Sequence, residues 1–174
     1  MTISNEVEDH QIGSKSGEKI LELVCFKLAA EEYAVDITQV QEVIRIQRIT
    51  PIPQMPEFTL GVINIRGTIV PVFDLRRKFQ LPTKEFDGLS KILVADIRGT
   101  LISFIVDEIL DNIRIESSCV DPSPTVKMNI DRDCIIGIGE LENRMIIILD
   151  LDTVNDLINS EIGTQEPSPV GGEG

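Results

Sequence analysis

Short apolar runs separated by turn residues make up most of this chain. The most distinctive pattern lies in residues 61–73. It predicts two strands, at 61–65 and 68–73, joined by a turn at Arg66 and Gly67. Gly67 can supply the positive φ that short hairpin turns require. Pro71 has no N–H group, so its strand is expected to carry an edge or a bulge at that point. The pattern predicts a β-hairpin around which the rest of the chain is organised.

The same layout returns near the C-terminus in residues 137–151. The spacing from Gly61 to Asp74 recurs from Gly137 to Asp150. Between these anchors the apolar positions correspond without a gap, in the pairs Val62 and Ile138, Ile65 and Leu141, Ile69 and Met145, and Phe73 and Leu149. Such an internal repeat indicates two similar β-subdomains, although one pair of hairpins can also match by chance.

Further strands are predicted where β-branched and other apolar residues run between turn residues, at 20–28, 33–36, 91–97, 101–107 and 109–115. Residues 50–56 contain three prolines and are expected to form an extended connection. Residues 117–132 are expected to form a long loop with little regular structure. The predicted body is therefore mainly β.

Short helices are predicted beside these strands. Apolar residues recur at helical spacing over residues 37–45, and Asp36 precedes them as a candidate helix cap. One helical turn is expected at residues 75–79. A terminal helix is expected at residues 151–158, where the apolar residues share one face.

Length and composition set the organisation of the chain. Residues 1–18 and 160–174 lack an apolar period and are expected to be disordered tails, which leaves residues 19–159 as the folded body. The 174 residues are enough for one domain or for two small barrels that share a core. Aromatic residues are only 4% of the chain and there is no Trp, so the core is expected to be aliphatic.

Charge and cysteine usage exclude several classes of protein. The net charge of −13 argues against nucleic acid and against an anionic membrane face as partners, because both need basic surfaces. It suits a soluble protein or one that meets a basic partner. Cys25, Cys119 and Cys134 are odd in number and lack C-x-x-C spacing, which points to a reducing compartment. No signal peptide and no apolar run of the roughly 20 residues needed to span a bilayer is visible, so a cytoplasmic location is expected.

The sequence offers little material for catalysis. Its one histidine, His10, lies in the predicted N-terminal tail, so a His-based triad or metal cluster is not expected. Asp74 and Asp150 end the two repeated hairpins, and two such carboxylates brought together would share a proton, as in an acid-using hydrolase. The alternative, which we favour, is that each aspartate caps the next helical turn. Residues 131–133 lack the later ligands of a calcium loop, and the basic run at 76–78 is expected to be a solvated turn.

Several separated motifs resemble, in order, those of the CheW family of chemotaxis coupling proteins. They are Y-A-V-D-I at 33–37, V-Q-E-V at 40–43, T-P-I-P at 50–53, G-V-I-N-I-R-G at 61–67, V-P-V-F-D-L-R at 70–76, F-I-V-D at 104–107 and G-I-G at 137–139. The similarity runs from about residue 20 to residue 158, and its motifs are specific because they occur together and in order.

This resemblance implies two SH3-like five-stranded β-barrels around a shared hydrophobic core, with short helices. It also implies a non-enzymatic scaffold without a cofactor, which joins the regulatory domain of the histidine kinase CheA to the cytoplasmic tips of methyl-accepting chemoreceptors. In this family the glutamate of V-Q-E and the arginine of N-x-R-G form a surface pair tied to partner binding; here these are Glu42 and Arg66. The residues that match the family's partner surfaces are Val40, Glu42, Gly61, Asn64, Arg66, Gly67 and Ile109.

An adaptor of this kind is expected in the cytoplasm, beside receptors at the inner membrane, without inserting into the membrane itself. Two other hypotheses stay open on the sequence. The chain is the coupling domain of a CheV-like regulatory protein truncated before its receiver domain, or it is an acid-using hydrolase built on Asp74 and Asp150.

Overall fold

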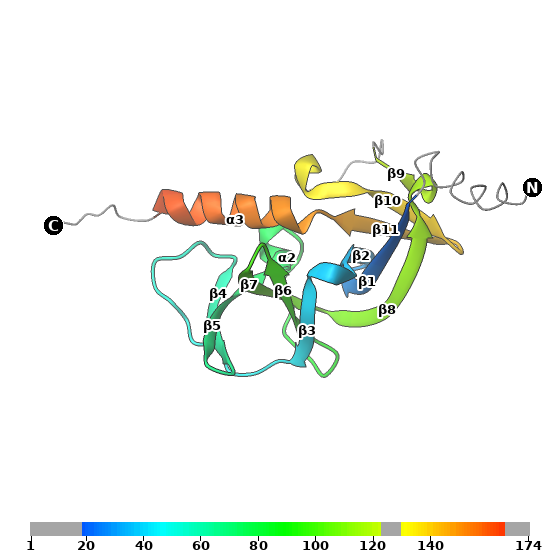
Figure 1. The fold of residues 1–174 in the computed structure, drawn as a ribbon. Coiled ribbons are helices and arrows are strands. Elements are labelled where there is room, and N and C mark those ends of the chain that lie inside the picture. Colours follow the sequence, from blue (N-terminus) through cyan, green and yellow to red (C-terminus); the bar gives the residue numbers. More distant parts are fainter. Residues whose placement is uncertain (1–18, 123–129, 166–174) are drawn as a thin grey trace, which may run out of the picture.

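The computed structural model describes residues 19–122 and 130–165, and strands make up most of its body (Figure 1). The first sheet has the order β8-β1-β2-β11-β10-β9, formed by β1 (Ile20–Leu28), β2 (Glu31–Asp36), β8 (Glu108–Glu116), β9 (Val120–Asp121), β10 (Ile135–Leu141) and β11 (Arg144–Leu149). The second has the order β3-β6-β7-β5-β4, formed by β3 (Val40–Arg45), β4 (Thr59–Ile65), β5 (Thr68–Asp74), β6 (Lys91–Ile97) and β7 (Thr100–Val106). The helices are α2 (Leu75–Lys78), α3 (Leu151–Gln165) and the 3-10 turns η1 (Ile37–Gln39), η2 (Ser117–Cys119) and η3 (Arg132–Cys134).

The two sheets are built on the same plan. In the first, the β1–β2 hairpin pairs in parallel with the β10–β11 hairpin through β2 and β11. In the second, the β6–β7 hairpin pairs in parallel with the β4–β5 hairpin through β7 and β5. The repeated hairpins of the sequence therefore occupy equivalent places, which confirms the prediction of two similar subdomains.

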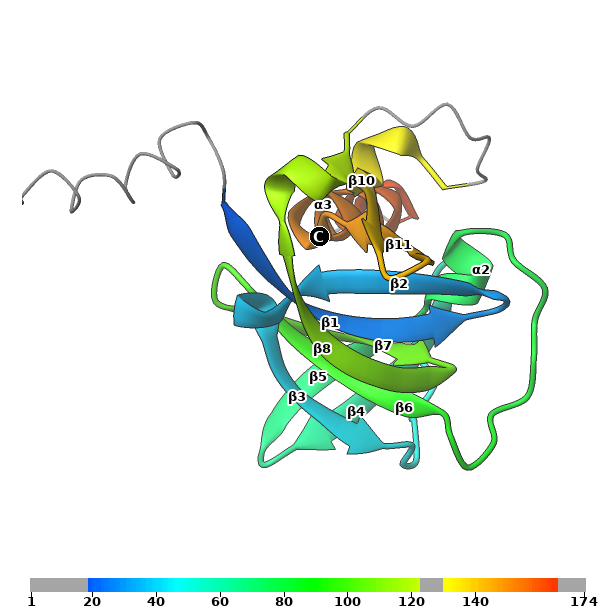
Figure 2. The same cartoon turned by 90° about the vertical axis from the view of Figure 1, so that its right-hand side faces the viewer.

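Each half of the molecule lends one strand to the other. Strand β3 follows β2 in the chain but pairs with β6 of the second sheet, whereas β8 follows β7 but pairs with β1 of the first (Figure 2). The two barrels are thus intertwined. The second barrel has five strands, and the first adds the two-residue β9 to its five.

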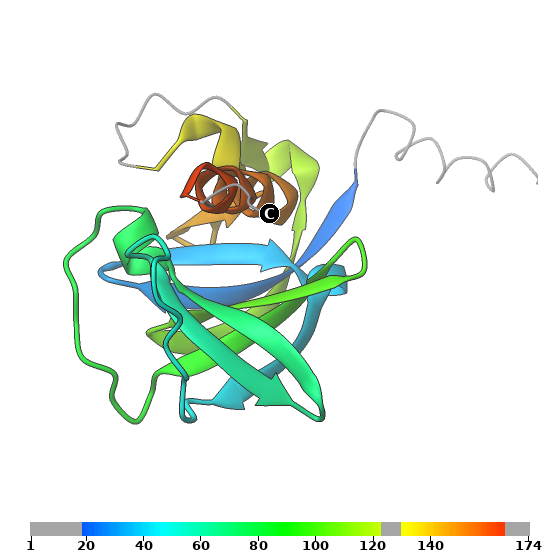
Figure 3. The ribbon, with the colours of Figure 1, turned by 90° about the vertical axis from the view of Figure 1, so that its left-hand side faces the viewer.

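The largest apolar cluster is shared by the two barrels. It joins Phe26 and Tyr33 of the first sheet to Leu93 and Phe104 of the second, and the ring centroids of Phe26 and Phe104 lie 6.5 Å apart. Helix α3 adds Leu151, Val154 and Ile158 to this cluster and covers the second sheet, which curls beneath it (Figure 3). Each barrel also holds a smaller cluster of its own. This is the predicted arrangement of two SH3-like barrels around a common core.

The helix predicted over residues 37–45 is wrong. Only η1 is helical, with Asp36 as its cap, and residues 40–45 are strand β3. The Thr38 N–H donates to Asp36 Oδ1 at 2.9 Å, so the cap itself was placed correctly. These residues form a strand because they pair with β6, with Val40 opposite Ala95, and β-branched residues favour strands. The local spacing of apolar residues does not reveal this tertiary partner.

Two boundaries predicted near the C-terminus also differ. Helix α3 continues to Gln165, so residues 160–165, which were assigned to a disordered tail, are helical. The segment 117–132, predicted as a loop, contains η2 and β9 and begins η3. The predicted tails at 1–18 and 166–174 lie outside the described residues.

The basic run at 76–78 is not a solvated turn. It forms α2, and the Arg76 side chain is only 11% exposed. Its Nε and Nη2 donate to the two carboxylate oxygens of Asp107 at 2.9 and 2.5 Å, and Asp107 Oδ2 also accepts from the Ala29 N–H at 2.8 Å. Burial alone would raise the pKa of Asp107, but these hydrogen bonds lower it overall. The pair fastens α2 to the start of β8 and to the β1–β2 turn.

Candidate partner-binding surface

The repeated aspartates are helix caps. Asp74 Oδ1 accepts from the backbone N–H groups of Arg76 and Arg77 at 2.9 and 3.4 Å. Asp150 Oδ1 accepts from those of Asp152 and Thr153 at 3.1 and 3.4 Å. Each carboxylate thus satisfies the free donors at the start of its own helix, α2 or α3, as the capping alternative predicted. The recurrence of aspartate is explained by the fold and calls for no shared proton.

Glu42 and Arg66 form the ion pair that the sequence predicted. Arg66 Nη2 contacts Glu42 Oε2, and Nη1 lies 3.5 Å from Oε1. The hydrogen bond to Glu42 raises the pKa of Arg66, whose side chain stays 69% exposed. Glu42 lies on β3 and Arg66 in the β4–β5 turn, and β3 and β4 are the two outer strands of the second sheet. The pair therefore bridges the two edges where this sheet closes into a barrel.

The turn that carries Arg66 is held by its neighbours. Arg66 and Gly67 both have positive φ, 48° and 89°, as a tight hairpin turn requires. The side chain of Asn64 accepts a hydrogen bond from the Gly67 N–H at 2.8 Å. Asn64 and Gly67 thus set the backbone from which the Arg66 guanidinium projects.

Gly61 allows a close approach of two backbone segments. Its φ is 145°, and a Cβ placed there would lie 2.1 Å from the carbonyl oxygen of Thr50. Thr50 pairs with Val62 through two backbone hydrogen bonds of 2.9 Å, so the segment after β3 adds to the edge of β4. Gly137 has the matching place in the first barrel, where a Cβ would lie 2.6 Å from the Asp121 carbonyl oxygen. Gly61 thus allows the segment after β3 to pack against β4 and close the barrel.

Val40 and Ile109 lie apart from the hairpin turn. Both are partly buried and pack against the shared core, Val40 on β3 and Ile109 on β8. These are the two exchanged strands. The structure therefore brings Glu42, Asn64, Arg66 and Gly67 together at one end of the second barrel and places Val40 and Ile109 at the margin between the barrels.

A groove that the sequence did not reveal lies between the β4–β5 hairpin, the β6–β7 turn and α3. Its volume is about 420 Å³, and most of its lining is apolar: Ile52, Met55, Val62, Ile69, Pro71, Phe73, Leu101, Ile102 and Ile162, with Gly61 at its wall. Asn155 and Asn159 of α3 also line it, as does Thr59, whose buried hydroxyl has no hydrogen-bond partner in the described part of the chain. Ile162 of this wall was missed by the sequence analysis because residues from 160 onward were assigned to a tail.

The described residues show no metal cluster, and two of the three cysteines are buried. Within 19–122 and 130–165, no group of three or more His, Cys, Asp or Glu side chains is arranged to hold a metal ion. Burial raises the pKa of the Cys25 and Cys134 thiols to about 11, which leaves them protonated at neutral pH. No helix in the described ranges has both the length and the apolar character to cross a membrane. What the surface offers is a groove and an exposed hairpin end, which suit binding.

Comparison with known proteins identifies relatives with the same plan. A family model described as a CheW-like domain matches residues 22–158. The chain is 31% identical to the chemotaxis protein CheW of Klebsiella aerogenes, covering 86% of this chain and 89% of that protein. It is 32% identical to the chemotaxis protein CheW of Bacillus subtilis, covering 84% and 92%. The crystal structure of the scaffolding protein TtCheW from Thermoanaerobacter tengcongensis superposes with a TM-score of 0.70, at 38% identity over 76% of this chain and 86% of that one.

A regulatory relative is less similar. The chemotaxis protein CheV3 of Helicobacter pylori is 25% identical over 71% of this chain and 41% of its own length. The similarity is higher, and covers more of the relative, for proteins named CheW than for this CheV protein.

Proposed function

The chain belongs to the CheW family, and from that premise we propose that it is a non-enzymatic adaptor of chemotaxis signalling, which couples methyl-accepting chemoreceptors to the regulatory domain of the histidine kinase CheA. The observation that carries the proposal is the duplicated barrel. An adaptor must hold two partners at once, and two intertwined barrels of one plan give the molecule more than one surface on which a partner can bind. Its place is the cytoplasm, beside the receptors at the inner membrane.

The groove beside α3 is our candidate for the receptor. Chemoreceptor tips are helical in this proposal, and an amphipathic helix binds by laying its apolar face into an apolar groove. The groove has such walls, and Ile69 stands at its rim with 60% of its surface exposed. The Asn155 and Asn159 side chains, which line the groove, would give polar groups of the incoming helix a partner. Gly61, which matches the family's partner surfaces, lines this groove, whereas Val40 lies on β3, outside its lining.

The Glu42–Arg66 pair is our candidate for orienting a partner at the hairpin end. An exposed ion pair contributes only about 0–1 kcal/mol to folding, so stability alone gives little reason for the pair. Held by Asn64 and Gly67, the guanidinium instead presents unused donors to an incoming surface. Ile109, on β8, extends the proposed contact toward the first barrel.

Reconstitution with purified kinase and receptor tests the proposal. The chain is added to CheA and to receptor-bearing vesicles from the same organism, and kinase autophosphorylation is followed with and without attractant. We expect receptor control of the kinase only when the chain is present, with no turnover of ATP by the chain alone. Receptor control that is equally strong without the chain would contradict the adaptor role, and so would nucleotide hydrolysis by the chain itself.

A further inference from the structure

Asn155 of α3 is a buried residue whose amide has no hydrogen-bond partner. The residue is only 6% exposed, and its side chain lines the groove beside α3. Its amide forms no hydrogen bond with any residue of 19–122 or 130–165. Buried polar side chains normally have such a partner, and a buried amide without one lowers the stability of the fold. Folding therefore does not explain this asparagine, whereas a bound group that reaches into the groove would.

The amide belongs to a stripe of α3 that faces the groove. Asn155, Asn159 and Ile162 follow one another at intervals of four and three residues, which places them on one face of the helix. All three line the groove. Asn159 is exposed and Asn155 is buried, so the stripe runs from the rim of the groove to its interior. The other faces of α3 pack in the shared core or form ion pairs.

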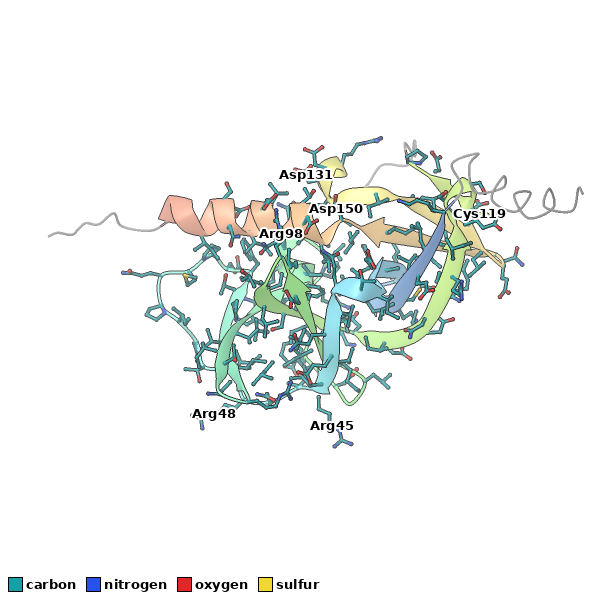
Figure 4. The ribbon with its side chains drawn as sticks, in the orientation of Figure 1. Arg45, Arg48, Arg98, Cys119, Asp131 and Asp150 are labelled. Carbon is teal, nitrogen blue, oxygen red and sulfur yellow. The ribbon has the colours of Figure 1, made fainter. Side chains whose placement is uncertain are left out.

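The charged side chains of this region are paired with one another outside the groove. Arg98, which lies beside α3 in Figure 4, donates to Asp156 at 3.0 Å, and its Nε lies 3.8 Å from an oxygen of Asp152. Lys78 contacts Glu161. Among the described residues, none that lines the groove is charged. Because burying a charge without a partner costs far more than burying a neutral polar group, the groove disfavours a charged side chain.

The groove admits side chains of a helix and not the helix itself. Its volume is about 420 Å³. An α-helix with its side chains is roughly 10–12 Å across, so a helix would lie along the rim and insert only a few side chains. The wall of the β4–β5 hairpin is apolar, from Val62, Ile69 and Phe73. The occupant is therefore expected to carry mostly apolar side chains, with one neutral polar group opposite Asn155.

We propose that Asn155 is a specificity-determining residue, which recognises a neutral amide side chain, Asn or Gln, on the receptor helix and so fixes the register of that helix in the groove. The inference rests on the proposed function. A carboxamide both donates and accepts, so two amides side by side satisfy each other with two hydrogen bonds. A single buried amide within an apolar seam sets register in coiled coils, because any shift of the helix leaves the amide unpaired. Asn155 acts in the same way here.

Affinity for receptor-bearing vesicles tests the role of the amide on the side of this chain. Vesicle binding is measured for the wild type, for N155L and for the matched control N112L, which makes the same substitution at an exposed amide of β8. We expect N155L to bind about tenfold more weakly, because the receptor amide would lose its partner, and N112L to differ by less than about twofold. N155L should melt no lower than the wild type, since it replaces an unpaired buried amide by an apolar group of similar size. Binding of CheA should be the same for all three proteins.

Substitutions in the receptor identify the partner amide. Each Asn and Gln of the receptor tip is replaced by Leu in turn, and the binding of every variant to wild type and to N155L is compared. At one position we expect the affinity of the wild type to fall about tenfold, whereas the affinity of N155L does not fall further, because two leucines then meet in the groove. A Glu at that position should bind the wild type more weakly than the amide does, since the groove offers no charged partner.

The outcomes separate this inference from the adaptor role. Equal receptor binding by wild type and N155L would overturn the inference and leave the adaptor role standing. An equal loss in N112L would also overturn it, as would a receptor in which no amide is coupled to Asn155. If N155L melts lower than the wild type, the receptor substitutions measured with the wild-type chain decide, and no weakening at any amide would refute the proposal. Failure of the wild type to bind the receptor vesicles would refute the proposed function itself.

Discussion

Asp74 and Asp150 hold matching positions in the two barrels, down to the backbone hydrogen bond that each makes. The Asp74 N–H donates to the carbonyl oxygen of Phe58 at 2.7 Å, and the Asp150 N–H donates to that of Cys134 at 2.7 Å. Each side chain then caps the helix that follows. The internal repeat is therefore one of structure, with the aspartate at the junction of hairpin and helix.

The two helix caps, Asp74 and Asp150, are expected to contribute similarly to stability. Asp74→Ala and Asp150→Ala should each lower the free energy of unfolding by about 1–2 kcal/mol, because each leaves helix N–H donors unsatisfied. Asp74→Asn and Asp150→Asn should lose less, since Asn also caps. Urea unfolding measures the free energy of unfolding of each variant and of the wild type. An Ala variant that unfolds like the wild type would contradict the capping role.

The Glu42–Arg66 pair predicts a loss of binding without a loss of folding. Glu42→Ala and Arg66→Ala should each change the free energy of unfolding by less than about 1 kcal/mol, as expected for an exposed pair. Both should weaken partner capture in pulldowns with CheA and receptor arrays. Lys84→Ala, which removes another exposed pair with Asp87, is the control and should leave capture unchanged. Unchanged capture by both test variants would remove the pair from the binding surface.

Gly61 and Gly67 give a comparison of two glycines with positive φ. Gly61→Ala should destabilise the fold by about 3 kcal/mol or more, because its new Cβ would add a clash with the Thr50 backbone to the conformational strain. Gly67→Ala has no atom within 4 Å of its new Cβ, so only a strain of about 1 kcal/mol is expected. Thermal melting of both variants shows which substitution destabilises the protein more. Equal losses would show that Thr50 does not close the barrel at this point.

The Arg76–Asp107 pair predicts an acid-sensitive contribution to stability. The pKa of Asp107 is lowered in the fold, so the pair stabilises the protein above about pH 4, and this stabilisation is lost as the pH falls through the lowered pKa. Asp107→Ala should cost about 2–3 kcal/mol at pH 7, since both side chains are largely buried and Arg76 would lose its partner.

The control for this pair is the exposed contact of Arg114 with Glu22 at 3.8 Å. Glu22→Ala should change stability by less than about 0.5 kcal/mol at any pH. Urea unfolding between pH 7 and acid pH compares the three proteins. If Asp107→Ala kept the acid dependence of the wild type, the pair would not be its source.

The repeated hairpins could be predicted because their apolar spacing and their turn residues are local signals. Strand β3 could not be predicted, because its partner β6 is about fifty residues away in the chain. In addition, the spacing of Val40, Val43 and Ile44 fits one face of a helix, and six residues are too few to decide between helix and strand. The burial of Arg76 was missed for the same reason: Asp107 is remote in sequence, and a basic run looks solvated until its partner is known.

The candidate site was predictable only in part. The sequence motifs identified four of its residues, which the structure brings together at one hairpin end: Glu42, Asn64, Arg66 and Gly67. The groove beside α3 was not foreseen, because it forms only when the β4–β5 hairpin, the β6–β7 turn and a longer terminal helix meet. Such concave surfaces depend on tertiary packing, and no single stretch of sequence encodes them.

Co-sedimentation with receptor-bearing vesicles tests the central claim most directly. Purified CheA is mixed with such vesicles in the presence and absence of the chain, and the kinase in the pellet is measured. We predict that the kinase pellets with the receptors in proportion to the added chain, because one molecule holds both partners on separate surfaces. A chain that displaced the kinase from the receptors, or left the pellet unchanged, would contradict this account.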